Sequence, residues 1–446
     1  MFSTFISMFK NKNVRERIVY TLGIFLIFKL GASITIPMVD VSQLQLGNQD
    51  MLSLMNIMGG GSLQQFSVFA MGVSPYITSS IVIQLLAAGV LPALSELNEQ
   101  GEQGKKSMEN ATRALTLMLG AVQAYGIIVT ALNYGMTING STEIKTWDAI
   151  VIITILMAGT LFLMWLGDQI TAKGVGNGMS MIIFAGIIAS VPTQFIAAFA
   201  LFVNDTSTVS ATFTGLIKFS AYVLCFLVLI VFVVFMERAQ RKLPIQYSNA
   251  SKSVRSQSDV TFLPMKVNSA GVIPIIFASS VMSAPSTIIA LVGGNQDSGF
   301  IRFLSLTAPY NGWYWGLTIF VILVILFTFF YARMQVDPEK ISENFSKSGA
   351  YIPGIKPGKE TARYVSTILN RVTFIGAGFI TIIGILPFVI QIVLNNIYPT
   401  ASQTLAAGFG GTGIIIIVGV ALETVKEIEG RMAGKDYSGF TSELDY

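Results

Sequence analysis

The chain offers little for covalent or metal chemistry. It contains no histidine, which removes the commonest general base and the commonest metal ligand near neutral pH. Its one cysteine, Cys225, lies in an apolar run, so a disulfide framework is excluded and a redox or zinc role is not expected. The long apolar segments carry no Asp, Glu, Lys or Arg, apart from Lys29 in the first of them and Lys218 at the start of the sixth. We therefore expect no cofactor, no metal and no enzymatic activity.

Two glycine-rich segments could bind a ligand or act as hinges. Residues 174–178 have the sequence Gly-Val-Gly-Asn-Gly, but no strand is predicted before them and the Lys-Ser/Thr ending of a phosphate-binding loop is missing. We expect these glycines to let a helix start close to a neighbour, or move. The triplet Gly59, Gly60 and Gly61 can act as a hinge, because glycine adopts backbone angles that other residues avoid. The segment around it is predicted to be an interfacial helix or a re-entrant segment that is buried in protein.

Three amide side chains interrupt the apolar segments. Gln84, Asn177 and Asn268 all fall toward the same side of the predicted membrane topology. Each could form an ordinary hydrogen bond between neighbouring helices. As a cluster, they would form a weakly polar seam, which is stable when closed but can part.

The elements that position these residues are predicted to be membrane-spanning helices. Hydrophobic residues make up 52% of the 446 residues, charged residues make up 12%, and the mean hydropathy is +0.66. A span needs about 20 mostly apolar residues. The ten candidates lie at about 18–37, 68–91, 114–134, 149–166, 179–200, 216–236, 269–292, 313–332, 372–394 and 404–422.

The basic residues predict the orientation of these spans. Of the 28 Lys and Arg residues, Lys145, Lys218 and Arg302 fall on one side, Lys29 lies within a span, and all the others fall on the opposite side. Basic residues near span ends are retained on the cytoplasmic face. We therefore expect a multi-pass membrane protein with both termini in the cytoplasm.

The predicted topology divides the chain into two halves of five spans. An odd number of spans in each half gives the second half an inverted orientation, as in several transporter folds. The predicted parts are an amphipathic cytoplasmic N-terminus (1–17), an N-terminal half (18–202), an extracytoplasmic connector (203–215), a C-terminal half (216–422) and a cytoplasmic tail (423–446). The expected fold is all-α, with the functional pathway between the halves.

Two cytoplasmic loops, 237–266 and 333–371, are longer than simple connectors need to be. Their basic residues could serve topology alone. Two long basic loops side by side would also form a docking platform for a large partner with an acidic surface. A nucleic-acid binder would instead spread its basic residues over a soluble face, so no sequence-specific nucleic-acid binding is expected.

Six ordered stretches of the chain carry a family resemblance. They are Phe69–Ile77, Met164–Ile170, Gly174–Gly178, Pro264–Asn268, Gly271–Ala278 and Lys347–Gly358. Together they resemble the SecY family, the channel subunits of bacterial protein translocases. The resemblance implies an hourglass channel closed by a plug and a hydrophobic ring, with a lateral gate between the halves.

The resemblance also assigns residues to these parts. The plug is a short re-entrant helix at about 52–64, which includes Asn56 and the glycine triplet. The docking residues are Arg241, Lys242, Arg255, Lys356 and Lys359. Lys356 stands where the family usually carries arginine, and lysine keeps the charge but lacks the planar fork. The gate amides are Gln84, Asn177 and Asn268, and the pore ring is Val73, Ile77, Met179, Ile183, Ile276 and Ile416.

The spacing of the ring residues agrees with this assignment. Val73 with Ile77, and Met179 with Ile183, are four residues apart, so each pair lies on one face of a helix. Met179 departs from the isoleucine common in the family, and its flexible thioether suits a compliant seal. A constriction without water-binding groups would block ions by dewetting.

The expected function is a passive conduit, in which unfolded preproteins cross the membrane and apolar helices leave sideways into lipid. The resemblance implies signal sequences as ligands, SecE and SecG as membrane partners, and the ATPase SecA and the ribosome as energy sources. A secondary transporter with inverted repeats is the alternative. It would need a charged or cation-coordinating site at mid-membrane, which the spans lack.

Overall fold

The computed structural model describes residues 11–42, 56, 59–87, 91–100, 102–133, 135–141, 145–203, 209–247, 261–291, 299–397 and 411–442. The helices are α2 (Lys12–Ala32), α4 (Ser74–Leu85), α5 (Pro92–Glu99), α6 (Glu102–Asn133), α7 (Thr146–Lys173), α8 (Gly178–Phe202), α9 (Val209–Arg238), α10 (Ile273–Leu291), α11 (Gly299–Leu304), α12 (Trp315–Gln335), α13 (Pro338–Ser348), α14 (Lys359–Ile397) and α16 (Gly411–Ser442). The strands are β1 (Val39–Asp40), β2 (Thr137–Ile138), β3 (Gln240–Tyr247), β4 (Thr261–Lys266) and β5 (Ala350–Tyr351).

Long apolar helices dominate the described part of the chain. Within it, six helical segments are long and apolar enough to cross a membrane, and they correspond to the third, fourth, fifth, sixth, eighth and ninth predicted spans. Helices satisfy every backbone hydrogen bond within one segment, which lipid requires. The multi-pass helical fold is confirmed. The other four predicted spans contain α2, α4, α10 and α16. The described parts of these helices are too short or too polar to count as membrane-crossing helices.

The second predicted span differs most from the expectation. Its helix α4 begins at Ser74 rather than near Val68, and residues 59–73 form turns. Pro75 lies in the first turn of α4, where proline is tolerated because its missing N–H would have no helical partner. The irregular segment before it is buried among helices, where its backbone groups can find partners.

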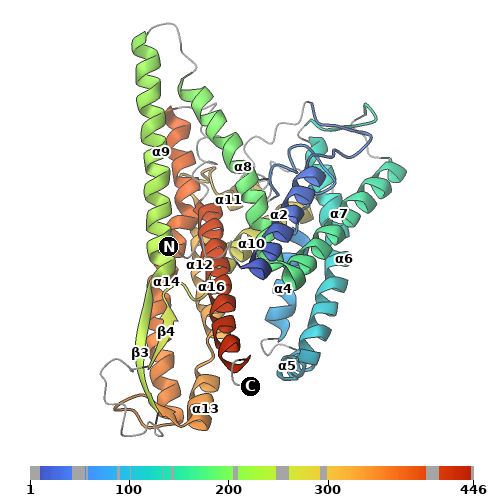
Figure 1. Cartoon of the computed structure of the whole chain (residues 1–446). Coiled ribbons are helices and arrows are strands. Elements are labelled where there is room, and N and C mark those ends of the chain that lie inside the picture. The colour runs from blue at the N-terminus through green and yellow to red at the C-terminus, as the bar shows by residue number, and fades with distance from the viewer. Residues whose placement is uncertain are drawn as a thin grey trace.

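The helices fall into two groups (Figure 1). In the first group α6 contacts α4 and α7, and α7 contacts α2 and α8. In the second group α12 contacts α10 and α14, and α16 contacts α9 and α14. The groups meet where α8 contacts α9 and α16, and where α10 contacts α4 and α6. Each group has its own apolar core, and a third core joins them.

A small sheet, which the sequence reading did not predict, brings the two long loops together. β3 pairs antiparallel with β4 from the same loop and with β5 from the loop after α12. Leu243 and Ile245 alternate with exposed residues along β3, as expected of a strand with one buried face. Leu243 packs with Met265 of β4 and with Val365 of α14, so the sheet rests on the start of that helix.

Candidate pore ring, plug segment and docking surface

The apolar core that joins the two groups of helices contains all six residues of the predicted ring. Val73, Ile183 and Ile416 are buried in it, exposing 5%, 7% and 3% of their surfaces. Ile77, Met179 and Ile276 pack against it from partly buried positions. We call these six residues the apolar ring. They come from α8, α10, α16 and the region where α4 begins, so segments from across the chain meet at one apolar junction.

The first turn of α8 is held in place by side-chain hydrogen bonds. The Asn177 amide oxygen accepts from the backbone N–H groups of Met179 and Ser180, at 3.1 and 3.3 Å. Asparagine is among the preferred residues at this capping position, because it satisfies N–H groups that have no helical partner. The Thr171 hydroxyl accepts from the Gly178 N–H at 2.9 Å and donates to the Gly167 carbonyl at 3.1 Å. The start of α8 is thereby tied to the end of α7.

The predicted plug lies partly outside the described residues, and its described part is irregular rather than helical, apart from Asn56. The Asn56 side-chain oxygen accepts from the Gln64 N–H at 2.9 Å, and the Asn56 carbonyl accepts from the Gly61 N–H at 2.8 Å. The Ser62 hydroxyl donates to the Phe69 carbonyl at 2.9 Å. These bonds close the turn, and Ser62 is fully buried.

The turn lies directly against α8 at a pair of glycines. A Cβ added to Gly60 would stand 3.1 Å from both the Cα and the carbonyl oxygen of Gly186. Gly60 also has φ +69°, in the left-handed region that favours glycine. The backbone of this turn (residues 59–64 of the predicted plug, called the plug turn below) therefore lies against the backbone of α8, one turn beyond Ile183.

The three predicted gate amides bond in separate places. Gln84 donates to Ser80 within α4 at 3.0 Å, and Asn177 caps α8. Asn268 donates to Glu237, at the end of α9, at 2.5 Å. None of the hydrogen bonds found among the described residues joins these amides to one another. Their role at a gate stays a prediction.

Apolar side chains form the contact between the two groups at the predicted gate. Ile81 of α4, Phe277 of α10 and Tyr331 of α12 belong to one buried cluster, with Ala270 before α10. Phe277 and Tyr331 have ring centroids 4.8 Å apart. An apolar contact of this kind can open toward lipid without leaving charges unpaired.

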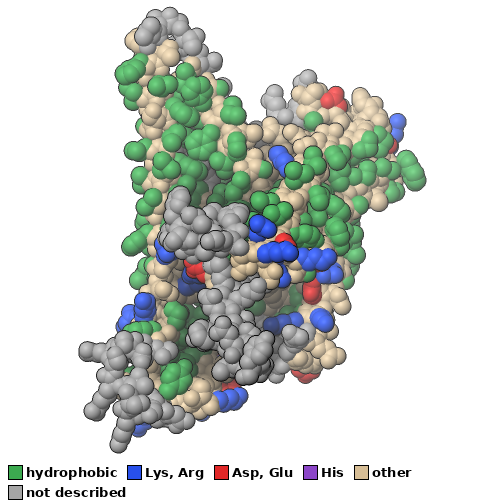
Figure 2. Space-filling model, viewed as in Figure 1, with side chains coloured by type: hydrophobic (Ala, Val, Ile, Leu, Met, Phe, Trp, Pro, Cys, Tyr) green, Lys and Arg blue, Asp and Glu red, His purple; other side chains and the backbone are tan. Residues whose placement is uncertain are grey.

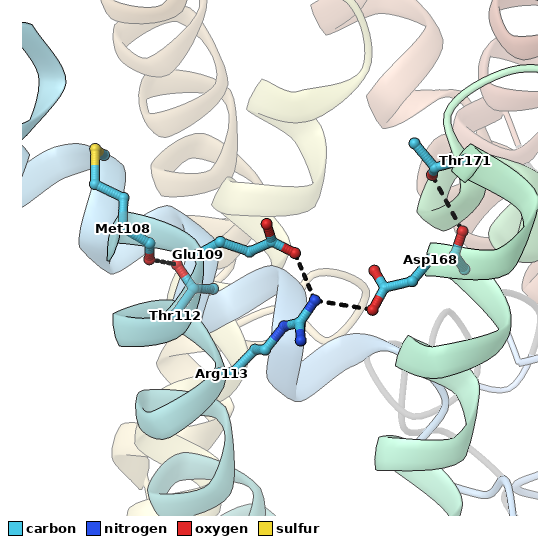
Figure 3. Close-up of polar contacts among 7 residues, drawn as sticks. Met108, Glu109, Thr112, Arg113, Asp168 and Thr171 are labelled. Carbon is cyan, nitrogen blue, oxygen red and sulfur yellow. Dashed lines mark hydrogen bonds and ion pairs between the residues drawn. The ribbon is translucent and has the colours of Figure 1, made fainter. Parts of the chain in front are cut away.

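A three-residue ion cluster joins α6 to α7 and was missed at the sequence level (Figure 3). Arg113 bridges Glu109, four residues earlier on α6, at 2.6 Å and Asp168 of α7 at 2.9 Å. The spacing of Glu109 and Arg113 was the available signal, since residues four apart are neighbours on a helix. Side chains exposed by 44–45% make each pair worth at most about 1 kcal/mol. The cluster fastens two helices of the first group and contains no reactive group.

The predicted docking residues within the described chain are exposed around the small sheet. Arg241 and Lys242 lie on β3, Lys356 lies between β5 and α14, and Lys359 is the first residue of α14. Arg255 lies outside the described residues. Figure 2 shows most Lys and Arg side chains at mid-height and below on this face, and hydrophobic side chains over the helices above.

The helix α13 borders this surface and is fixed at both ends. The Asp337 side chain accepts from the N–H groups of Glu339 and Lys340, and Gly349 ends the helix with φ +67°. Lys347 lies 2.8 Å from Glu343, and its hydrogen bond lowers the pKa of that carboxyl below its usual value. The charge of Lys347 at the border of this surface is therefore paired with a carboxylate.

The chain was compared with protein families, curated proteins and solved structures. A family model described as SecY matches residues 67–425. The protein translocase subunit SecY of Bacillus subtilis strain 168 is 41% identical over 454 residues, covering 99% of each chain. A solved structure described as "The structure of a protein conducting channel" has a TM-score of 0.67 at 16% identity, covering 93% of this chain and 91% of the other. Another, described as Sec61 in the canine ribosome-channel complex from the endoplasmic reticulum, has a TM-score of 0.65 at 15% identity, with the same coverage.

Proposed function

Since this chain belongs to the SecY family and is a protein-conducting channel of the Sec translocation system rather than an enzyme, we propose that the apolar ring is its closed constriction. One observation carries the proposal: six apolar side chains from four regions of the chain meet in one core. Unfolded polypeptide would pass where they meet. A ring of aliphatic side chains offers no groups to replace the hydration shell of an ion, so the closed ring excludes ions by dewetting.

The plug turn would seal the channel on one side of this ring. Its seat is the contact between Gly60 and Gly186, because Gly186 lies on the helix that supplies Met179 and Ile183 to the ring. A contact between two backbones without intervening side chains holds few interactions. A passing segment can therefore displace it.

The lateral gate would lie between α4 and α10. The contact of Ile81 with the cluster of Phe277 and Tyr331 supports this position, since these helices belong to the two different groups. Parting there would expose apolar side chains to lipid tails, which are equally apolar. Helices sufficiently apolar to enter lipid would leave the channel by this route.

The surface around the small sheet would dock the partner that drives translocation. The exposed basic residues of β3 and of the segment before α14 support an acidic partner surface, and the predicted topology places them in the cytoplasm. SecA and the ribosome are the proposed driving partners, and SecE and SecG the proposed membrane partners. The proposed location is the plasma membrane of a bacterium.

The ring is tested by making it polar. Ile183→Asn should raise the ion conductance of the resting channel in planar bilayers, because a side-chain amide wets a dry constriction. Ile276→Asn should act in the same direction from α10. The matched control is Ile188→Asn, on the same helix at a position exposed by 43%. Equal conductance in the ring variants and the control, with all of them folded, would show that the ring does not form the seal.

A further inference from the structure

The C-terminal helix α16 reaches across to the loop that starts α8. The Glu427 carboxylate accepts a hydrogen bond from the Gly176 N–H at 2.9 Å, although the residues are 251 positions apart. One turn earlier on α16, the Thr424 hydroxyl lies 3.5 Å from the Met181 sulfur. Helices α8 and α16 lie side by side in Figure 1 and are in contact. The contact joins the two groups of helices outside the apolar ring.

The geometry of the loop depends on this approach. Gly176 has φ +81°, and a Cβ added there would stand 3.2 Å from the Thr424 hydroxyl oxygen. A carboxylate that accepts from a backbone N–H forms a charge-assisted hydrogen bond, about twice as strong as a neutral one. Glu427 is itself half-buried, which strengthens the bond further by limiting water.

The N-terminal helix α2 holds the same loop from another direction. Arg17 donates to the Gly174 carbonyl at 3.1 Å, and the Thr21 hydroxyl accepts from the Val175 N–H at 3.2 Å. The Val175 side chain is buried in a small apolar cluster with Val14 of α2 and Ile428 of α16. The loop is thus gripped between α2 and α16.

Helices α8 and α16 both supply residues to the apolar ring. Asn177 and Gly178 follow Gly176 directly, and the next residue is Met179 of the ring. Ile416 lies on α16, three turns before Glu427. A shift of α8 along α16 would move Met179 and Ile183 away from the level of Ile416, so the ring needs a fixed register between these helices.

We infer that Glu427 is a positioning residue of the channel: its bond to Gly176 fixes α8 against α16 and so holds the ring closed. The inference rests on the proposed role of the ring. It also assigns Gly176 a purpose, since the missing side chain lets Thr424 of α16 approach the loop closely. Glu427 bonds to Gly176, three residues before Met179 of the ring, so it acts on the ring through α8.

The experiment compares Glu427→Ala with Glu427→Gln and Glu423→Ala in a Cys225→Ser background. Glu423 is exposed one turn earlier on α16, so its replacement removes the same charge without touching the loop. Resting conductance is measured in planar bilayers. The register of α8 against α16 is measured independently, as the distance distribution between spin labels attached through Ile188→Cys on α8 and Glu429→Cys on α16, both at exposed positions.

Glu427→Ala should raise resting conductance roughly tenfold, as expected for loss of a hydrogen bond to a charged group, and should broaden the label distances. Glu427→Gln keeps an acceptor oxygen and should restore most of both signals, while Glu423→Ala should change neither. Unchanged label distances in Glu427→Ala would overturn the inference, and so would changed distances with unchanged conductance. If Ile183→Asn does not leak, the ring proposal has failed, and the label distances still decide whether Glu427 positions α8.

Discussion

Replacing Gly60 by alanine should unseat the plug turn. The substitution acts twice, because Gly60 has φ +69° and its new Cβ would stand 3.1 Å from the backbone of Gly186. A residue with a Cβ pays roughly 1–2 kcal/mol in the left-handed region. That difference lowers the ratio of seated to unseated turn by a factor of about 5–30. The contact with Gly186 adds to this, since neither backbone can move as a flexible side chain would.

The assay is resting ion conductance of the purified channel in planar bilayers, without a driving partner. Gly61→Ala is the matched control, because Gly61 has φ +86° but no atom within 4 Å of its added Cβ. Gly61→Ala has only the cost of the left-handed backbone conformation, without a steric contact, so it should leak less than Gly60→Ala. Gly23→Ala, in α2, meets no atom within 4 Å and should not leak.

The outcomes separate the causes. If Gly60→Ala and Gly61→Ala leak equally, the contact with Gly186 contributes nothing and the seat lies elsewhere. If neither leaks while both remain folded by thermal unfolding, the turn of residues 59–64 does not seal the channel, and the reasoning from its backbone geometry is refuted.

Two further predictions concern the docking surface and the gate. Reversing the charge of Arg241 or Lys356 should weaken binding of the ATPase or ribosome with a steep salt dependence, because exposed charges are screened within about 8 Å at physiological ionic strength; equal binding by variant and unmodified channel at low and moderate salt would reduce these residues to topology signals. Cysteine pairs scanned along α4 and α10, starting from Ser80 and Ser279, should include some whose crosslinking stops protein passage until reduction. Passage through every crosslinked pair would show that the gate need not open there.

The apolar ring could be anticipated because its members follow local rules. Val73 with Ile77, and Met179 with Ile183, are spaced for one helix face, and the family resemblance supplied Ile276 and Ile416, which spacing alone does not connect. The structure brings all six together. Whether they form the seal stays a prediction until conductance is measured.

Contacts made by the backbone could not be anticipated in this way. The seat of Gly60 on Gly186 and the bond from Gly176 to Glu427 join positions far apart in the sequence, and a backbone N–H or Cα is common to every residue. Asn177 is different. Its place just before an apolar helix is the signal of a capping residue, which the sequence reading did not use and from which the observed cap could have been predicted.

The small sheet was not predicted, because its basic residues were attributed to membrane topology alone. The alternation of Leu243 and Ile245 with exposed residues is a strand pattern, but it lies beside basic residues that the predicted topology already explained. Its pairing with β5 also depends on a loop about a hundred residues later in the chain, which no local pattern reveals.

The length of α14 has a mechanical consequence. Its 39 residues form one helix of about 58 Å, which starts at Lys359 beside the small sheet and ends at Ile397. Val365 and Leu369 are gripped by the sheet, while Ile380 and Ile383 are packed in the core of the second group. A force applied by a partner at the sheet would therefore be transmitted along one continuous helix to the core of the second group. Pro387 follows these core residues and has no N–H to form a helical hydrogen bond. The helix α14 therefore bends most easily there.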